Sequence, residues 1–195
     1  VFNDTEVLDV SGNPLYTEDF PELIVCSERS LNCYNVNNGG AWWNLGTTDL
    51  SGLTGASVFD FNGDGLNEIV YRDENNLRIM YGGNTPFPGG VDGNRNWAVF
   101  QGGSGTFDEY PVIADVDDDG QAEIIVTGHD GHAHGNLRGD YRGHLRVFEG
   151  ITPWMPARPI WNQYNYFVRN VNEDGIIPQN QEDQYVQIGD NYPYN

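Results

Sequence analysis

Two short stretches of the sequence place closely spaced oxygen side chains between apolar runs. They are SVFDFNGDGLNEIVY at residues 57–71 and VIADVDDDGQAEIIV at residues 112–126. Each contains a loop of the form D-x-[DN]-x-D-G-x-x-E. In a tightly curled loop, side chains at alternate positions point to one centre, and a cluster of hard oxygen ligands suits Ca²⁺ better than other common metals. The sequence therefore predicts two calcium sites.

The predicted ligands occupy the same positions in both loops. Glycine at the sixth position, Gly65 or Gly120, permits a sharp turn that aims a backbone carbonyl at the centre. With that carbonyl included, the predicted ligands are Asp60, Asn62, Asp64, Leu66 and Glu68 in the first loop, and Asp115, Asp117, Asp119, Gln121 and Glu123 in the second.

The spacing excludes an EF-hand as the source of these loops. An EF-hand needs a bidentate Glu at its twelfth position and a helix on either side. Here the twelfth position is Tyr71 or Val126, and the flanking segments are rich in β-branched residues. Two copies in one strand context also argue against ordinary solvated hairpin turns.

Composition limits the class of protein and the partners. The 195 residues include 25 Gly, 10 Pro and 13% aromatic residues, which favours many short strands and turns. Asp and Glu number 29 against 9 Lys and Arg, a formal net charge of −20. This charge argues against nucleic acid or an anionic membrane surface as a partner. No apolar run reaches the roughly 20 residues of a membrane span, so we expect no membrane insertion.

An internal repeat surrounds the two loops. Segments 22–26, 68–72 and 123–127 each begin with Glu and continue as an apolar run. A second predicted strand follows at 31–34, 77–80 and 145–148, with apolar residues at its first and third positions. A Trp-bearing segment comes next. Repeats of about 40–55 residues with some four short antiparallel strands are typical of β-propeller blades, so we predict an all-β fold.

The two loop segments, 58–70 and 112–126, resemble the FG-GAP/VCBS repeats of integrin-α-type β-propellers. The resemblance covers about residues 20–150 and implies that each loop joins two strands of a blade and binds Ca²⁺. The family's ligand positions match the residues named above one for one. This sequence departs from the pattern by using Glu at the ninth position and by lacking a loop before Glu22.

We expect three regions: an N-terminal strand or linker at 1–20, three propeller repeats at 21–150, and an aromatic-rich cap with a polar tail at 151–195. The last region resembles the closing segment of large bacterial surface proteins, and a cap is favoured there over a binding surface. Three repeats cannot close a wheel of typically 4–8 blades. We therefore expect a partial propeller whose partner is another protein chain, either the remainder of a longer protein or a copy of this one. The start at Val1 indicates a processed product or an excised fragment.

The only two cysteines, Cys26 and Cys33, lie in one predicted hairpin. A turn at Arg29-Ser30 would place them opposite each other, so we predict a cross-strand disulfide and an oxidising compartment. Millimolar extracellular calcium points to the same extracellular or cell-surface location.

Two weaker metal sites remain open. His129, His132 and His134 could hold Zn²⁺ or Cu²⁺, although a hydrated Gly-rich loop is the favoured interpretation. Asn170, Asn172 and Asp174 repeat the start of a calcium loop, but Pro178 stands at the ninth position. A third calcium site there is the less favoured alternative.

The sequence contains no assignable catalytic constellation. The leading hypothesis is a non-enzymatic, calcium-stabilised extracellular module for adhesion or self-assembly, as a surface or filament subunit. The alternative is a carbohydrate-binding or catalytic propeller of an extracellular lyase or hydrolase. Its sugar groove would be lined by Trp42, Trp43, Trp97 and Tyr110, although their repeated positions favour blade core.

Overall fold

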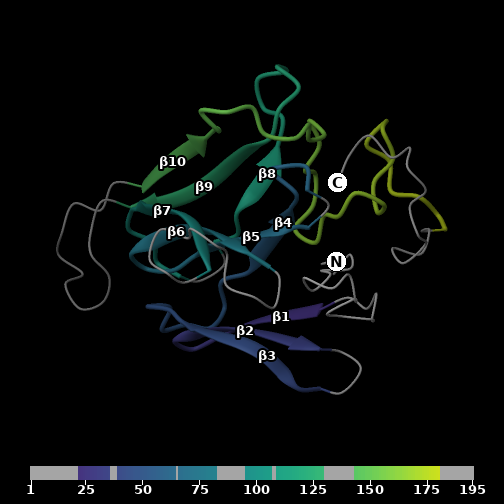
Figure 1. Cartoon of the computed structure of the whole chain (residues 1–195). Coiled ribbons are helices and arrows are strands. Elements are labelled where there is room, and N and C mark those ends of the chain that lie inside the picture. Colours follow the sequence, from purple (N-terminus) through teal and green to yellow (C-terminus); the bar gives the residue numbers. More distant parts are fainter. Residues whose placement is uncertain are drawn as a thin grey trace, which may run out of the picture.

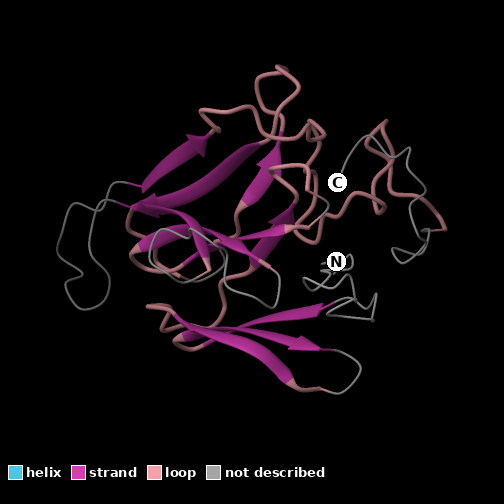
Figure 2. Cartoon of the chain, viewed as in Figure 1, coloured by secondary structure: helices cyan, strands magenta, loops and turns pink. Residues whose placement is uncertain are grey.

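The computed structural model describes residues 22–35, 39–64, 66–82, 95–106, 109–129 and 143–180. Within these ranges the chain forms ten strands and no helix (Figure 2). Accordingly, this part of the chain holds no helix long and apolar enough to cross a membrane.

The strands form three antiparallel sheets that follow one another along the chain (Figure 1). The first sheet contains β1 (Glu22–Ser27), β2 (Ser30–Asn35) and β3 (Ala41–Gly46). The second contains β4 (Ala56–Phe59), β5 (Glu68–Arg72), β6 (Asn76–Tyr81) and β7 (Asn96–Gln101). The third contains β8 (Val112–Ala114), β9 (Glu123–His129) and β10 (Gly143–Phe148).

The second sheet lies between the other two, and a hydrophobic core fills each side of it. Alternation along the strands divides their apolar residues between the two cores. Ile69, Tyr71 and Met80 pack toward the first sheet, against Leu31 and Trp43 among others.

On the other side of the second sheet, Val70, Leu77 and Ile79 pack toward Ile124 and Val126 of the third sheet. This arrangement is that of consecutive blades in an incomplete β-propeller, and it confirms the predicted fold class.

The predicted disulfide is wrong, because the hairpin turns one residue earlier than expected. The turn falls at Glu28-Arg29, where Arg29 has φ 63°, and Ser27 pairs with Ser30. Cys26 therefore faces Leu31, and Cys33 faces Ile24. The two thiols are diagonal neighbours on one face of the hairpin and are not joined.

After β10 the chain runs without strands through residues 149–180 and returns to the loops that precede β5 and β9. The Met155 amide donates to the Phe61 carbonyl at 3.1 Å, and the Asp115 amide donates to the Arg158 carbonyl at 3.3 Å. Trp154 packs edge-on against Phe61, with ring centroids 4.7 Å apart. This segment therefore braces the two acidic loops from outside the sheets.

Candidate metal centre

The two acidic loops make equivalent connections in consecutive sheets. The first joins β4 to β5 and the second joins β8 to β9. Each is closed by its ninth residue: Glu68 Oε2 accepts the Phe61 amide, and Glu123 Oε2 accepts the Val116 amide, both at 2.9 Å. Both glutamates are buried at the start of a strand, so sheet formation itself fixes the end of each loop.

The first residue of each loop turns the backbone in the same way. Asp60 Oδ1 accepts the Gly63 amide and Asp115 Oδ1 accepts the Asp118 amide, both at 2.7 Å. Gly63 and Asp118 have φ 75° and 64°, in the left-handed region that Gly and Asp adopt more readily than most residues.

The fifth residue of each loop shapes the next turn. Asp64 Oδ1 accepts the Leu66 amide and Asp119 Oδ1 accepts the Gln121 amide, both at 2.8 Å. Gly120 has φ 88°, as the sixth position requires, whereas Gly65 lies outside the described residues. The two loops thus share one hydrogen-bonded frame that leaves other carboxylate oxygens for a cation.

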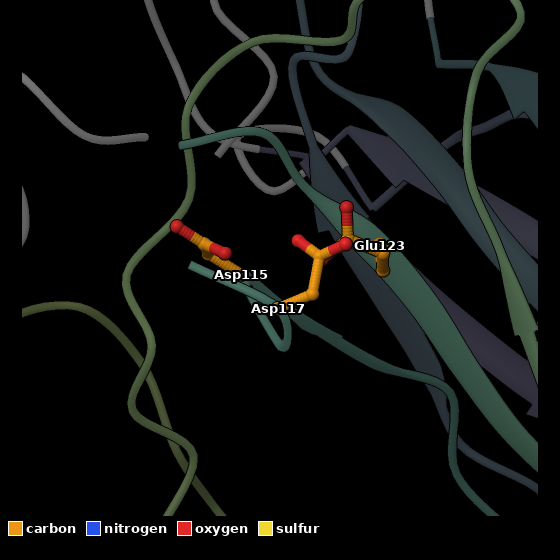
Figure 3. A group of neighbouring side chains, drawn as sticks. All are labelled: Asp115, Asp117 and Glu123. Carbon is orange, nitrogen blue, oxygen red and sulfur yellow. The ribbon is translucent and has the colours of Figure 1, made fainter. Parts of the chain in front are cut away.

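In the second loop, carboxylates from three positions converge. One oxygen each of Asp115, Asp117 and Glu123 lie within 4.8 Å of one another (Figure 3). Calcium ligands stand 2.3–2.6 Å from the ion, so two ligands on one ion are at most about 5 Å apart. The spacing and the purely oxygen donor set both fit Ca²⁺.

In the first loop, an amide takes the place of one carboxylate. Asn62 Nδ2 donates to Asp64 Oδ2 at 3.1 Å and approaches Glu68 Oε1 at 3.4 Å. The amide thus links the two carboxylates. Asn62 Oδ1 meanwhile accepts the Asp64 amide at 2.8 Å, and a calcium ion at this loop stays a prediction.

The buried glutamates are costly to ionise without a cation. Burial raises the pKa of Glu68 to about 8, with Asp64 and Asp60 adding to the shift and the Phe61 amide opposing it. Burial likewise raises the pKa of Glu123, helped by Asp117, Asp119 and Asp115 and opposed by the Val116 amide. A divalent cation among these carboxylates would offset the repulsion.

Of the side-chain ligands predicted from the sequence, the structure brings Asp115, Asp117 and Glu123 together. Sequence reasoning missed Phe61 and Val116, whose backbone amides hold the ninth-position glutamates. The sequence marks these two residues only by their position, directly after the first Asp of each loop. For Leu66 and Gln121, the structure shows amides engaged with the loop frame, and their proposed carbonyl role stays a prediction.

The weaker metal predictions stay untested. Asp174 accepts the Ile176 amide at 3.0 Å, as the other two loops do at their fifth position. Asn170 instead bonds its own segment: Oδ1 accepts the Phe167 amide, and Nδ2 donates to the Asn165 carbonyl. His129 ends β9, and His132 and His134 lie outside the described residues.

The aromatic residues considered for a sugar groove lie mostly inside the sheets. Trp43 is buried between the first and second sheets, and Trp42 packs beside it. Trp97 packs against the core between the second and third sheets. Tyr110 contacts Trp161, with ring centroids 5.8 Å apart. These positions favour blade core over a ligand platform.

Consecutive antiparallel sheets of three or four strands, two of which contain an oxygen-lined loop between neighbouring strands, are typical of repeat proteins of the β-propeller class. Residues 60–126 match the sequence model of the FG-GAP-like repeat, which confirms the resemblance inferred from the loops.

The chain is also similar to the biofilm matrix protein Bap1 of V. cholerae, known from a crystal structure. The TM-score is 0.65 and the sequence identity 27%, over 83% of this chain and 25% of that one. The chain thus spans about a quarter of the length of Bap1. A search of curated proteins gave no significant match.

Proposed function

We propose that this chain is a non-enzymatic, calcium-stabilised β-propeller module that acts outside the cell in adhesion or self-assembly. The FG-GAP-like repeat at residues 60–126 supports a propeller module, and the similarity to a biofilm matrix protein supports an extracellular, adhesive setting. The observation that carries the calcium role is the convergence of Asp115, Asp117 and Glu123.

A structural role suits these carboxylates better than a catalytic one. Glu68 and Glu123 each hold a backbone amide, and Asp60 and Asp115 hold the loop turn. Residues fixed in this way organise a loop, and a cation bound among them would lock it between two strands. Folding free energy would then include the free energy of calcium binding.

Calcium-dependent melting tests the structural role. We expect the melting temperature in millimolar calcium to exceed that in EGTA, because a ligand that binds only the folded state stabilises it by about 2.7 kcal/mol at 100 times its Kd. The matched pair Asp115→Asn and Asp118→Asn separates ligand from neighbour: only the first should lose the part of the calcium response that the second loop contributes. Equal melting in calcium and EGTA would overturn the structural role.

Light scattering and electron microscopy in calcium and after chelation test the assembly role. Ordered oligomers that dissociate in EGTA are the expected result. A folded monomer that also fails to adhere to cell or polysaccharide surfaces, in calcium as well as EGTA, would contradict adhesion and assembly together.

A further inference from the structure

A short piece of the C-terminal segment contacts both acidic loops. The Met155 amide donates to the Phe61 carbonyl at 3.1 Å, and three residues later the Arg158 carbonyl accepts the Asp115 amide at 3.3 Å. Three residues of extended chain span at most about 11 Å. The two loops, which belong to different sheets, are therefore joined by one short stretch of backbone outside the sheets. We call residues 154–158 the bridging segment.

Both contacts involve backbone groups next to the predicted calcium ligands. The Phe61 carbonyl belongs to the peptide group that joins Phe61 to Asn62, and the Phe61 amide donates to Glu68 Oε2 at 2.9 Å. On the other side, Asp115 is itself one of the three carboxylates that converge in the second loop. A movement of the bridging segment would therefore move the backbone of both loops at their ligands.

The bridging segment has little freedom to move by itself. Pro156 lies within it and Pro159 follows it directly, and each proline ring fixes the backbone φ. Ala157 is 6% exposed and lies in the core between the second and third sheets, and Trp154 packs against the same core. A displacement at one end of the segment would thus be passed to the other end rather than absorbed between them.

A buried cation anchors the end of the bridging segment that contacts the second loop. Arg158 is 4% exposed, and its Nη1 donates to the Val168 carbonyl at 2.8 Å and to the Tyr166 hydroxyl at 3.2 Å. Its Nε lies 3.1 Å from a carboxylate oxygen of Glu173. Separating a buried charge from its partners is costly, so these contacts hold the Arg158 carbonyl in place for Asp115.

The first loop leaves room for the other end of the bridging segment. A Cβ built at Gly63 would lie 2.8 Å from Met155 Sδ, so a side chain there would push Met155 aside. The second loop carries Asp118 at the same position. The close approach of the bridging segment is therefore specific to the first loop and is permitted by its glycine.

We propose that the bridging segment couples the two loops, so that calcium bound at the second loop also stabilises the backbone of the first. The inference rests on the proposed calcium role and adds a path between the loops. Calcium would fix Asp115, and with it the Arg158 carbonyl. The constrained segment would then hold the Phe61 carbonyl. Because coupling is reciprocal, an ordered first loop would in turn favour calcium binding at the second.

Hydrogen exchange of single backbone amides in the full chain tests the coupling. Asp64→Asn removes a predicted carboxylate ligand of the first loop but keeps an Oδ1 for the Leu66 amide, so added calcium acts through the second loop. Calcium should then slow exchange of the Val116 amide. It should also slow the Phe61 amide by about fivefold or more, the lower end of coupling between protein sites. The Val70 amide, in the central strand β5, reports opening of the whole sheet and should slow less than Phe61.

Two substitutions at one position test the path through the bridging segment. Met155→Pro removes the amide that contacts Phe61, whereas Met155→Leu keeps it and is the matched control. Combined with Asp64→Asn, Met155→Pro should abolish the response of Phe61 to calcium and leave that of Val116, whereas Met155→Leu should keep both. Arg158→Met keeps every backbone group but loses the anchor. It should also weaken the Phe61 response, and it replaces Met155→Pro if that variant does not fold.

Failure of the coupling and failure of the calcium role give different results. If calcium slows Val116 while Phe61 changes no more than Val70, the coupling is wrong and the calcium role stands. If the Met155→Pro and Met155→Leu proteins respond alike, the path through the bridging segment is wrong. If calcium slows none of the three amides even in the wild type, the calcium role is wrong and the coupling fails with it.

Discussion

The loops at residues 60–68 and 115–123 share a backbone frame but are held in place differently. Phe61 of the first loop is 1% exposed and packs against Phe59 and Trp154, whereas Val116 at the same position of the second loop is 52% exposed. Asn62 links carboxylates in the first loop, whereas the equivalent Asp117 adds another negative charge to the second.

The two loops therefore keep the same backbone turn by different interactions. The first loop is anchored by the packing of Phe61 in the core, and the Asn62 amide hydrogen-bonds to two of its carboxylates. The second loop has four side-chain carboxylates among its predicted ligands and little packing over its second residue. We therefore expect the second loop to depend more strongly on calcium than the first.

The largest expected effect comes from removing the anchor of the first loop. Phe61→Ala should lower the free energy of unfolding by roughly 3–5 kcal/mol, because it leaves a cavity beneath the loop. The matched Val116→Ala should cost less than about 1 kcal/mol, since that side chain is largely in solvent. Denaturant unfolding of both variants in calcium checks this contrast, and equal losses would refute the packing asymmetry.

Neutralising the ninth-position carboxylate of the second loop should remove its calcium response. Glu123→Gln should lose about 2–3 kcal/mol of calcium-dependent stabilisation at saturating calcium. In EGTA the same variant should be more stable than wild type, because the pKa of Glu123 is raised and its anion is therefore unfavourable in the fold. Melting curves in the two buffers measure both signs.

Exchanging the third position between loops should exchange part of their calcium affinity. Asp117→Asn should weaken calcium binding at the second loop by roughly tenfold, about 1.4 kcal/mol, through loss of one negative ligand. Asn62→Asp should strengthen binding at the first loop by a similar factor. Calorimetric titration resolves the two classes of site, and unchanged affinities in both variants would mean that ligand charge does not set the difference.

The smallest effect should come from salt. In EGTA, raising ionic strength should stabilise the wild type by less than about 1 kcal/mol, because screening acts on the exposed acidic residues of the second loop. Asp117→Asn should show a smaller salt response than Asn62→Asp. A larger response in Asp117→Asn would reverse the proposed order of the loops.

Sequence patterns located most of the strands because the repeat presents the same apolar periods three times. Glu22, Glu68 and Glu123 each begin a strand as predicted. The hairpin register was not accessible in the same way: Arg29 at φ 63° moves the turn by one residue, and nothing in its residue type indicates a left-handed conformation. A shift of one residue changes every cross-strand partner, which is why the disulfide prediction failed.

For the candidate site, spacing within a loop identified the side chains that converge, since ligand and backbone positions there are local. The contrast between Phe61 and Val116 is not local. It depends on residues 154 and 155, almost 100 positions away, which cover one loop and not the other. Packing between distant segments cannot be read from a nine-residue motif.

Because the two cysteines are not joined, thiol labelling can measure how often the first and second sheets separate. Burial, with Asp49 adding to it, raises the pKa of Cys26 to about 12, and Cys33 is fully buried between the first and second sheets. Cys26 is partly exposed, whereas Cys33 has no exposed surface, so alkylation of Cys33 must wait for the first and second sheets to separate. The labelling rate of Cys33 would thus report how often the contact between the first and second sheets opens, with Cys26 as the one other thiol of the sequence.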